Sequence, residues 1–174
     1  MIVKDKSVLD IEAAKEKLRK SLKHNFYYIG REWPYKDVKP RIIAEQYMED
    51  HTDGELRDYK FFCFDGEPKL MFCATERNSG HVKFDYYDLE FNHVDLTQKY
   101  PNASRPIRKP AKFDEMIQIA RKLSAGLPHI RVDLYEVDGK VYFGELTFYH
   151  FSGFAPFRPS SWDKVFGDWL KLPE

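Results

Sequence analysis

The sequence predicts an α+β fold, with a mainly antiparallel sheet and flanking helices. Helical patterns are separated by blocks of extended segments, and these segments come in pairs joined by tight-turn signals. Strands joined by short turns pair antiparallel, because parallel strands need a crossover of a dozen or more residues. With 174 residues, the chain is long enough for one domain with a substantial core.

The first third of the chain is predicted to contain one helix and little sheet. Residues 2–3 resemble a strand fragment, and a capping-box pattern at Ser7 begins a helix that ends near Leu22. A connection rich in Tyr, Trp and Pro follows over residues 24–39. The apolar run at residues 41–48 is typical of a buried strand.

The middle of the chain is predicted to form three strands, at residues 58–64, 70–77 and 82–88. The first two form a hairpin around a Gly–Pro turn signal, and we expect Phe64 to pair with Lys69. Three prolines make the stretch at residues 90–111 irregular.

The last third of the chain is predicted to contain two helices and a hairpin. Apolar residues at helical spacing predict a helix over 114–125, with Gly126 as its C-terminal cap. A hairpin follows over residues 131–147, and a short final helix is expected near residues 162–170.

Composition excludes several classes of protein. The 28 basic residues balance the 28 acidic ones, which argues against a main role in gripping nucleic acid or an anionic membrane. No apolar run approaches the ~20 residues that span a bilayer, and the first ten residues lack the layout of a signal peptide. In the expected register Cys63 and Cys73 are not partners, and lone cysteines suit a reducing compartment. A cytoplasmic location is therefore expected.

The hairpin at residues 131–147 carries the most informative pair of side chains. Asp133 stands near the start of one apolar strand and Glu145 near the end of the next. Carboxylates at buried strands are costly unless they are paired, hydrogen-bonded or holding a cation. A Mg²⁺–nucleotide site is one interpretation; a solvated Asp133 with Glu145 salt-bridged to Arg131 is the other.

The turn of this hairpin decides whether the two carboxylates meet. A two-residue turn at Asp138-Gly139 places Glu145 opposite Val132, on the face away from Asp133. A three-residue turn places Glu145 opposite Arg131, diagonal to Asp133 and on its face. The metal hypothesis therefore requires the three-residue turn.

Basic residues on the first hairpin are candidates for binding phosphate or carboxylate oxygens. In the Phe64–Lys69 register one face of the hairpin carries Asp58, Lys60, Cys73 and Thr75, and Arg77 continues this face. Solvated basic residues at strand ends are the alternative. The run at residues 42–50 passes from apolar to acidic, as an interdomain hinge that contacts adenine and ribose does, although a strand that ends in a polar turn explains it more simply.

Other motifs point elsewhere or are missing. His150, Ser152 and Asp163 suggest a hydrolase triad, but no G-x-S-x-G elbow surrounds Ser152. The histidines and cysteines show no zinc-ligand spacing, and neither G-x-G-x-x-G nor a Walker A sequence occurs.

Taken together, four segments resemble the C-terminal part of an ATP-grasp protein, and most of all the TupA-like (teichuronopeptide-biosynthesis) family. The segments are IGREWPY at 29–35, KPRIIAEQYMED at 39–50, DYKFFCFDGEPK at 58–69 and RVDLYEVDGKVYFGELTFYH at 131–150. The resemblance implies two α+β subdomains that cradle ATP. Residues 1–44 would belong to the first subdomain and residues 45–174 to the second.

The resemblance also implies roles for individual residues. Binding of the nucleotide is assigned to Glu45, Gln46, Tyr47 and Met48 at adenine, Glu49 or Asp50 at ribose, and Lys60 at phosphate. Arg77 and Arg131 are the candidate catalytic residues. Asp133 and Glu145 match the acids that bind Mg²⁺. Thr147 stands where ATP-grasp enzymes place a metal-binding Asn, and a hydroxyl is a poorer neutral ligand than an amide oxygen.

The activity implied by the family is ATP- and Mg²⁺-dependent ligation of a carboxylate to an amine through an acyl phosphate. The expected partners are a nucleotide, an amino acid and a uronate of a cell-surface polysaccharide, with a homo-oligomer or a completing chain also expected. Ile2 to Lys6 resemble the strand after the glycine-rich phosphate loop, so that loop and the N-terminal domain are expected to be missing.

Two further functions remain open. A non-catalytic remnant would bind nucleotide, glycan or a partner, with an aromatic patch that comprises Tyr27, Tyr28, Trp33 and Tyr35. A glycosyltransferase-associated role is weaker, because the Asp-x-Asp motif of many such enzymes does not occur.

Overall fold

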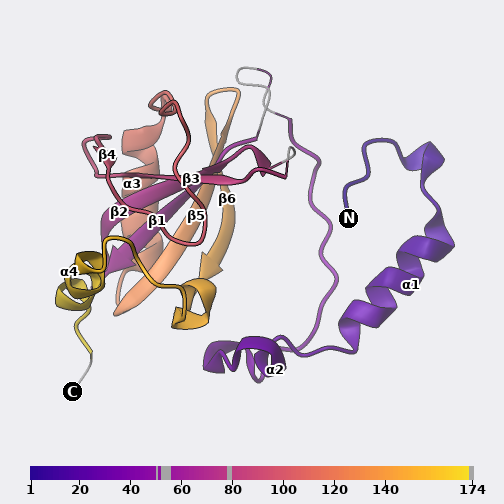
Figure 1. Ribbon diagram of the computed structural model, residues 1–174. Helices are drawn as coiled ribbons and strands as arrows, with labels where there is room; N and C mark the ends of the chain where they lie inside the picture. The colour runs from indigo at the N-terminus through magenta and orange to yellow at the C-terminus, as the bar shows by residue number, and fades with distance from the viewer. Residues whose placement is uncertain (50, 52–55, 78–79, 173–174) are drawn as a thin grey trace. The chain divides into compact units, whose positions relative to one another are not determined.

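The computed structural model describes residues 1–49, 51, 56–77 and 80–172. The chain forms two compact units, Met1–Met48 and Glu49–Glu174. The first unit contains two α-helices, α1 (Ile11–Leu22) and α2 (Tyr27–Gly30), and two 3₁₀ turns, η1 (Lys6–Val8) and η2 (Trp33–Tyr35) (Figure 1).

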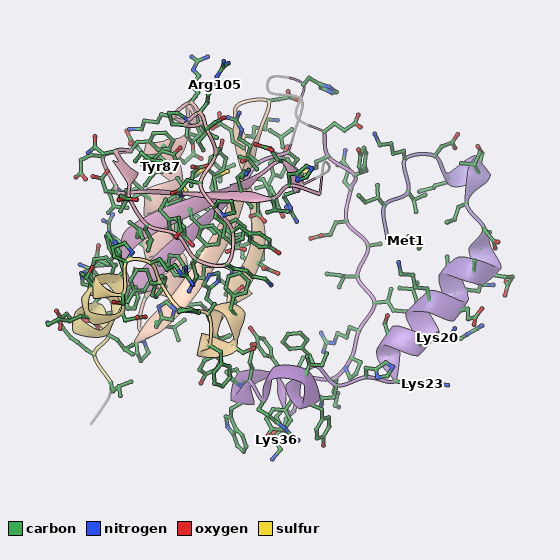
Figure 2. The ribbon with its side chains drawn as sticks, viewed as in Figure 1. Met1, Lys20, Lys23, Lys36, Tyr87 and Arg105 are labelled. Atoms are coloured by element: carbon green, nitrogen blue, oxygen red, sulfur yellow. The ribbon has the colours of Figure 1, made fainter. Side chains whose placement is uncertain are left out.

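Helix α1 begins later than its sequence pattern suggests. Asp10 is its N-cap, because the Asp10 carboxylate accepts a hydrogen bond from the Ala13 N–H at 2.9 Å. Ser7 instead belongs to η1, whose cap is Asp5. The capping box predicted at Ser7 is therefore wrong, while the predicted end at Leu22 is confirmed. Lys20 and Lys23 lie at the exposed C-terminal end of α1 (Figure 2).

Two predicted strands of the first unit are not formed. Residues 2–3 and 41–48 have no regular secondary structure, and Ile43 is 79% exposed. A strand is stable only where its backbone groups pair with a neighbour. Within the described part of the first unit there is no strand for either segment to pair with, so both predictions are wrong.

The second unit is built on a six-stranded antiparallel sheet in the order β4-β3-β2-β1-β5-β6. Its strands are β1 (Asp58–Phe64), β2 (Glu67–Thr75), β3 (Lys83–Tyr87), β4 (His93–Val94), β5 (His129–Val137) and β6 (Lys140–Thr147). Its helical elements are α3 (Phe113–Ser124), the turn η4 (His150–Gly153) and α4 (Ser161–Trp169). The predicted antiparallel α+β fold is confirmed, and the predicted bounds of β1, α3 and α4 hold to within one residue.

The two faces of the sheet carry separate cores. Helix α3 covers one face, where Phe113, Met116 and Ala120 pack against side chains such as Phe61 and Ile130. On the other face Phe62, Phe72 and Phe84 form an aromatic core, which Phe166 and Trp169 of α4 cover in part. Burying aromatic side chains on both faces is the main source of stability for such a sheet.

The β1–β2 hairpin has a two-residue turn and a bulge. Asp65 and Gly66 both have positive φ, Phe64 pairs with Glu67, and the register shifts between Phe62 and Cys63. The expected pairing of Phe64 with Lys69 is therefore wrong. Pro68 has no N–H for the ladder, which favours a bulge beside it.

This shift moves the predicted cationic face. Lys60 now pairs with Phe72, and Cys73 pairs with Tyr59. Because paired residues share a face and neighbours alternate, Cys73 and Thr75 lie on the face away from Lys60, contrary to the sequence-based prediction. Cys63 and Cys73 are both buried and free, as expected.

The β5–β6 hairpin also combines a two-residue turn with a bulge. Asp138 and Gly139 have φ of 51° and 72°, and Val137 pairs with Lys140. Further along, Leu134 pairs with Phe143 but Asp133 pairs with Glu145, so Gly144 is the extra residue. The predicted need for a three-residue turn is wrong, because the bulge restores Glu145 to the face of Asp133.

We predict that Gly144→Ala destabilises the protein by about 1–3 kcal/mol, the usual cost of overpacking. A Cβ at Gly144 would lie 2.9 Å from the Asp133 carbonyl oxygen and 2.9 Å from Tyr135 Cε2. The measurement is the free energy of unfolding from urea titration. Gly167→Ala is the matched control: its Cβ meets nothing within 4 Å, and alanine in a helix stabilises by up to about 1 kcal/mol. Equal stability of the two variants would contradict the assignment of Gly144 as an obligatory bulge residue.

Candidate functional site

A row of charged side chains crosses three neighbouring strands of the second unit. Lys60 of β1 pairs with Asp133 of β5, and Asp133 pairs with Glu145 of β6. Paired residues share a face of the sheet, so the three side chains project on the same side. This is the face of Phe62 and Phe72, opposite to helix α3.

Asp133 is at the centre of this row and has no exposed surface. Arg131 binds it with two hydrogen bonds, from Nε to Oδ1 at 2.7 Å and from Nη2 to Oδ2 at 2.8 Å. The Lys60 ammonium also donates to Asp133 Oδ2. A buried carboxylate stays ionised only with such partners, and paired hydrogen bonds from a guanidinium are among the strongest available.

Asp58 is a second buried carboxylate on the same face. Its Oδ2 lies 2.6 Å from Lys60 Nζ and 3.6 Å from Arg77 Nη1. Its Oδ1 is buried without a hydrogen-bond partner among the described residues, and burial raises the pKa of Asp58. The Lys60 ammonium is thus shared between Asp58 and Asp133. Sequence analysis placed Asp58 beside Lys60 but missed it as a site residue; its position two residues before Lys60 on one strand was the available signal.

Glu145 is the most accessible carboxylate of the row, with its side chain 62% exposed. Its Oε1 accepts hydrogen bonds from Arg131 Nη2 at 2.9 Å and from the Thr147 hydroxyl at 3.3 Å. Desolvation raises the pKa of Glu145, and the negative charge of Asp133 raises it further. Two carboxylates that face each other in this way favour a cation between or beside them.

The far side of Arg131 is held by His150, which does not belong to the row and is held in turn by Gln98. Arg131 Nη1 lies 2.7 Å from His150 Nδ1, and His150 Nε2 lies 2.7 Å from Gln98 Oε1. Sequence analysis considered His150 only for a hydrolase triad. Both of its ring nitrogens are engaged by Arg131 and Gln98, so it is not available as a base for Ser152.

Burial lowers the pKa of His150 to about 2, with the charges of Arg131 and Lys60 contributing next. The pKa of Arg131 is raised. Burial alone would lower it, but the hydrogen bonds and the charge of Asp133 outweigh burial. His150 is therefore neutral and Arg131 charged at neutral pH.

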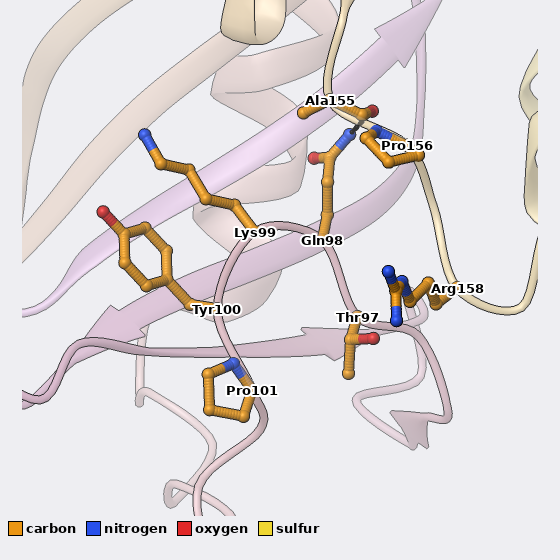
Figure 3. A pocket seen from close by; sticks show the side chains of 8 residues that line it. All are labelled: Thr97, Gln98, Lys99, Tyr100, Pro101, Ala155, Pro156 and Arg158. Carbon is orange, nitrogen blue, oxygen red and sulfur yellow. Dashed lines mark hydrogen bonds between the residues drawn. The ribbon is translucent and has the colours of Figure 1, made fainter.

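A cavity of about 520 Å³ lies next to this network (Figure 3). It is lined by residues 97–101 on one side and by Ala155, Pro156 and Arg158 on the other. Gln98 donates from Nε2 to the Ala155 carbonyl oxygen at 2.8 Å, which ties the two walls together. Hydrogen bonds between the backbones of Thr97 and Arg158 add a second tie.

The carboxylates fit Mg²⁺ as a partial ligand set. Among the described residues no group of three or more His, Cys, Asp or Glu side chains is arranged to hold a metal ion. Mg²⁺ in nucleotide sites often uses only one or two carboxylates, with phosphate oxygens and waters completing its shell. Asp133 and Glu145 would form such a pair. Because Asp133 Oδ2 already accepts from Lys60, a metal ion there competes with that ammonium.

Of the other residues predicted for the site, some lie beside the charged row and some do not. Arg77 borders the row beside Asp58, and Thr147 directs its hydroxyl to Glu145. Glu45, Gln46, Tyr47 and Met48 end the first unit without regular structure, and Glu49 begins the second. Asp50 lies outside the described residues. The structure thus brings together Lys60, Arg131, Asp133, Glu145 and Thr147, and the nucleotide-binding roles of residues 45–50 stay predictions.

Among the described residues no helix has the length and apolar character needed to cross a bilayer.

Comparison with known proteins adds one finding. The family model for the TupA-like ATPgrasp family matches residues 1–171. The search of curated proteins and the search of solved structures each found no match.

We predict that Arg131→Met costs about 3–5 kcal/mol of unfolding free energy, because it removes the main partner of a fully buried carboxylate. The double variant Arg131→Met/Asp133→Leu removes both charges and should be more stable than the single variant. Urea titrations of the wild type, both single variants and the double variant measure the coupling. Additive effects of the two substitutions would contradict direct pairing of Arg131 with Asp133.

The neutral His150 predicts a stability change with pH. The unfolded chain takes up a proton below the ordinary histidine pKa of 6.5, whereas folded His150, with a pKa of about 2, does not. The free energy of unfolding should therefore fall as pH drops below 6.5, by up to about 1.4 kcal/mol per pH unit from this group.

The test compares the wild type with His150→Asn, which cannot titrate in this range. The difference in unfolding free energy between the two proteins should change between pH 6.5 and pH 4.5, by up to about 1.4 kcal/mol for each pH unit. Parallel pH profiles would show that His150 titrates normally in the folded state.

Proposed function

The chain belongs to the TupA-like ATP-grasp family, and we propose on this basis that it binds ATP with Mg²⁺ for the ligation of a carboxylate to an amine. The observation that carries this proposal is the pairing of Asp133 with Glu145 on one face of the sheet, bordered by Lys60 and Arg131. ATP would supply a phosphoryl group that activates the carboxylate for attack by the amine.

The charges of the row suit this chemistry. Asp133 and Glu145 are the proposed Mg²⁺ ligands, with Thr147 as a weaker neighbour that orients Glu145 through its hydroxyl. Mg²⁺ would neutralise charge on the phosphate oxygens. Lys60 and Arg131 would stabilise the charge that develops on the transferred phosphoryl group.

Asp58 gives Lys60 a second anchor. The ammonium contacts both Asp58 and Asp133, so it keeps one buried carboxylate partner when the other binds a cation. Arg77, half exposed beside Asp58, is proposed to contact phosphate or substrate. Glu45 to Met48 are proposed for adenine, and Glu49 or Asp50 for ribose. The division into two ATP-grasp subdomains, residues 1–44 and 45–174, also stays a prediction.

The proposed substrates follow from the family. They are an amino acid and a uronate carboxylate carried by a cell-surface polysaccharide. A second copy of the chain, or another chain, is the proposed partner if the site needs further residues.

A second candidate function is binding without catalysis. It is favoured by exposed aromatic side chains in the first unit, where Tyr28 is 66% and Trp33 63% exposed. Lys36 Nζ lies 4.4 Å from the centre of the Trp33 ring. Aromatic rings with neighbouring cations are suited to acidic sugars or to a protein partner.

We predict that Mg²⁺–ATP raises the melting temperature of the wild type, and that Asp133→Asn/Glu145→Gln abolishes the Mg²⁺-dependent part of the shift. Ligand at a hundred times its Kd stabilises by about 2.7 kcal/mol, which a thermal-shift titration resolves. Glu90→Gln, an exposed carboxylate of the same unit, is the matched control and should respond as the wild type does. No shift in the wild type would refute the nucleotide site in this chain.

Turnover separates the two candidate functions. Release of ADP only when an amino acid and a uronate are both present supports the ligase. Binding of Mg²⁺–ATP with no ADP release under these conditions supports the non-catalytic alternative.

A further inference from the structure

The guanidinium of Arg131 is held from two directions, and only one of them belongs to the carboxylate row. Nε and Nη2 face Asp133 and Glu145, whereas Nη1 faces His150 Nδ1 at 2.7 Å. We propose that His150 is a positioning residue, a neutral ring with its proton on Nε2, which holds Arg131 in register with the two carboxylates.

The hydrogen-bond partners determine the tautomer. Arginine is only a donor, so His150 Nδ1 must accept from Nη1–H and cannot carry a proton. The proton then lies on Nε2, which donates to Gln98 Oε1 at 2.7 Å. Gln98 in turn donates from Nε2 to the carbonyl oxygen of Ala155. In this series of hydrogen bonds, from Arg131 to Ala155, each donor faces an acceptor. Flipping the Gln98 amide would break two of the contacts.

The His150 ring is itself held firmly. Its centroid lies 5.0 Å from that of Phe62, 5.3 Å from Phe72 and 4.2 Å from Phe151. The three residues after it, Phe151, Ser152 and Gly153, all have positive φ, between 49° and 77°. Such backbone is uncommon for residues other than glycine and persists only where its surroundings impose it. The turn η4 thus presents the ring to Arg131.

A second half-buried histidine, His129, provides a comparison within the same fold. His129 also packs on an aromatic ring, that of Phe64, but its Nδ1 bonds the backbone carbonyl of Cys63 at 2.9 Å. That bond joins the ring to the backbone of the neighbouring strand β1. His150 instead connects two side chains, one charged and in contact with both carboxylates and the other in the wall of the cavity (Figure 3).

Removing the acceptor at Nδ1 leaves a buried N–H of Arg131 without a partner. The guanidinium then gains an alternative orientation, and the contacts that it makes to Asp133 and Glu145 loosen together. The effect on the row is indirect, so His150 acts through Arg131 and touches neither carboxylate in this network.

Two substitutions separate the acceptor from the packing. His150→Phe keeps an aromatic ring among Phe62, Phe72 and Phe151 but has no acceptor. His150→Asn loses ring contacts but places an amide oxygen near the position of Nδ1. The matched control is His129→Phe, which changes the other half-buried histidine. Near-ultraviolet circular dichroism checks that each variant is folded.

The direct readout is nuclear magnetic resonance of the ¹⁵N-labelled full chain without ligand. We expect the wild type to show His150 as the Nε2–H tautomer, assigned by its loss in the variants, and a protected Arg131 Nε–H signal. This arginine signal should weaken or broaden in His150→Phe, and should persist in His150→Asn and His129→Phe. An Nδ1–H tautomer in the wild type, or an unchanged arginine signal in His150→Phe, would overturn the proposal. Equal loss in His150→Asn and His150→Phe would reduce His150 to a packing residue.

A second readout rests on the proposed function. Affinity for Mg²⁺–ATP should fall about tenfold in His150→Phe and less than threefold in His150→Asn, while binding of ATP without Mg²⁺ changes little. A wild type that binds no Mg²⁺–ATP would refute the proposed function but leave the test by magnetic resonance intact. Normal Mg²⁺–ATP affinity in His150→Phe, with a wild type that binds, would overturn the role of His150 in positioning the row.

Discussion

The ionised carboxylate of Asp133, with no exposed surface, is the constraint on which the rest of the site depends. Its charge requires Arg131 and Lys60 as partners, and each of those cations then needs further acceptors of its own. Arg131 finds them in Glu145 and His150, and Lys60 finds one in Asp58. A single buried charge thus organises side chains from β1, β5, β6 and η4.

Backbone irregularities bring these side chains to one face. Each hairpin closes with a two-residue turn and then gains one bulge, beside Pro68 in the first and at Gly144 in the second. A bulge shifts the alternation of side chains by one residue beyond it. Without the bulge at Gly144, Glu145 would face α3 and Asp133 would have no carboxylate opposite it.

Most elements of the second unit were predictable, because turn signals and apolar periodicity are local properties of the chain. Strand β4 was not predicted, since it lies in the stretch at residues 90–111 that was expected to be irregular. The bulges were not, since a glycine in a strand indicates neither the presence nor the direction of a register shift. The importance of His150 also escaped prediction, because it arises from contact with Arg131, which is distant in sequence. Asp58 was missed although it stands two residues before Lys60 on the same strand, because the sequence does not show that its carboxylate is buried. The strand expected at residues 41–48 does not form, because apolar composition alone does not supply a neighbouring strand to pair with.

The formal charges of the site affect how it would bind a metal ion and a nucleotide. The carboxylates of Asp58, Asp133 and Glu145 are matched by the cations of Lys60, Arg77 and Arg131, so the charges of these side chains are close to balanced. A divalent cation added alone leaves an excess of positive charge in a partly buried place, which is unfavourable. The phosphates of a nucleotide would compensate this excess and would give Lys60 a partner in exchange for Asp133. Metal and nucleotide would therefore favour each other's binding at the proposed site, and a positive coupling of this kind is reciprocal by thermodynamic linkage.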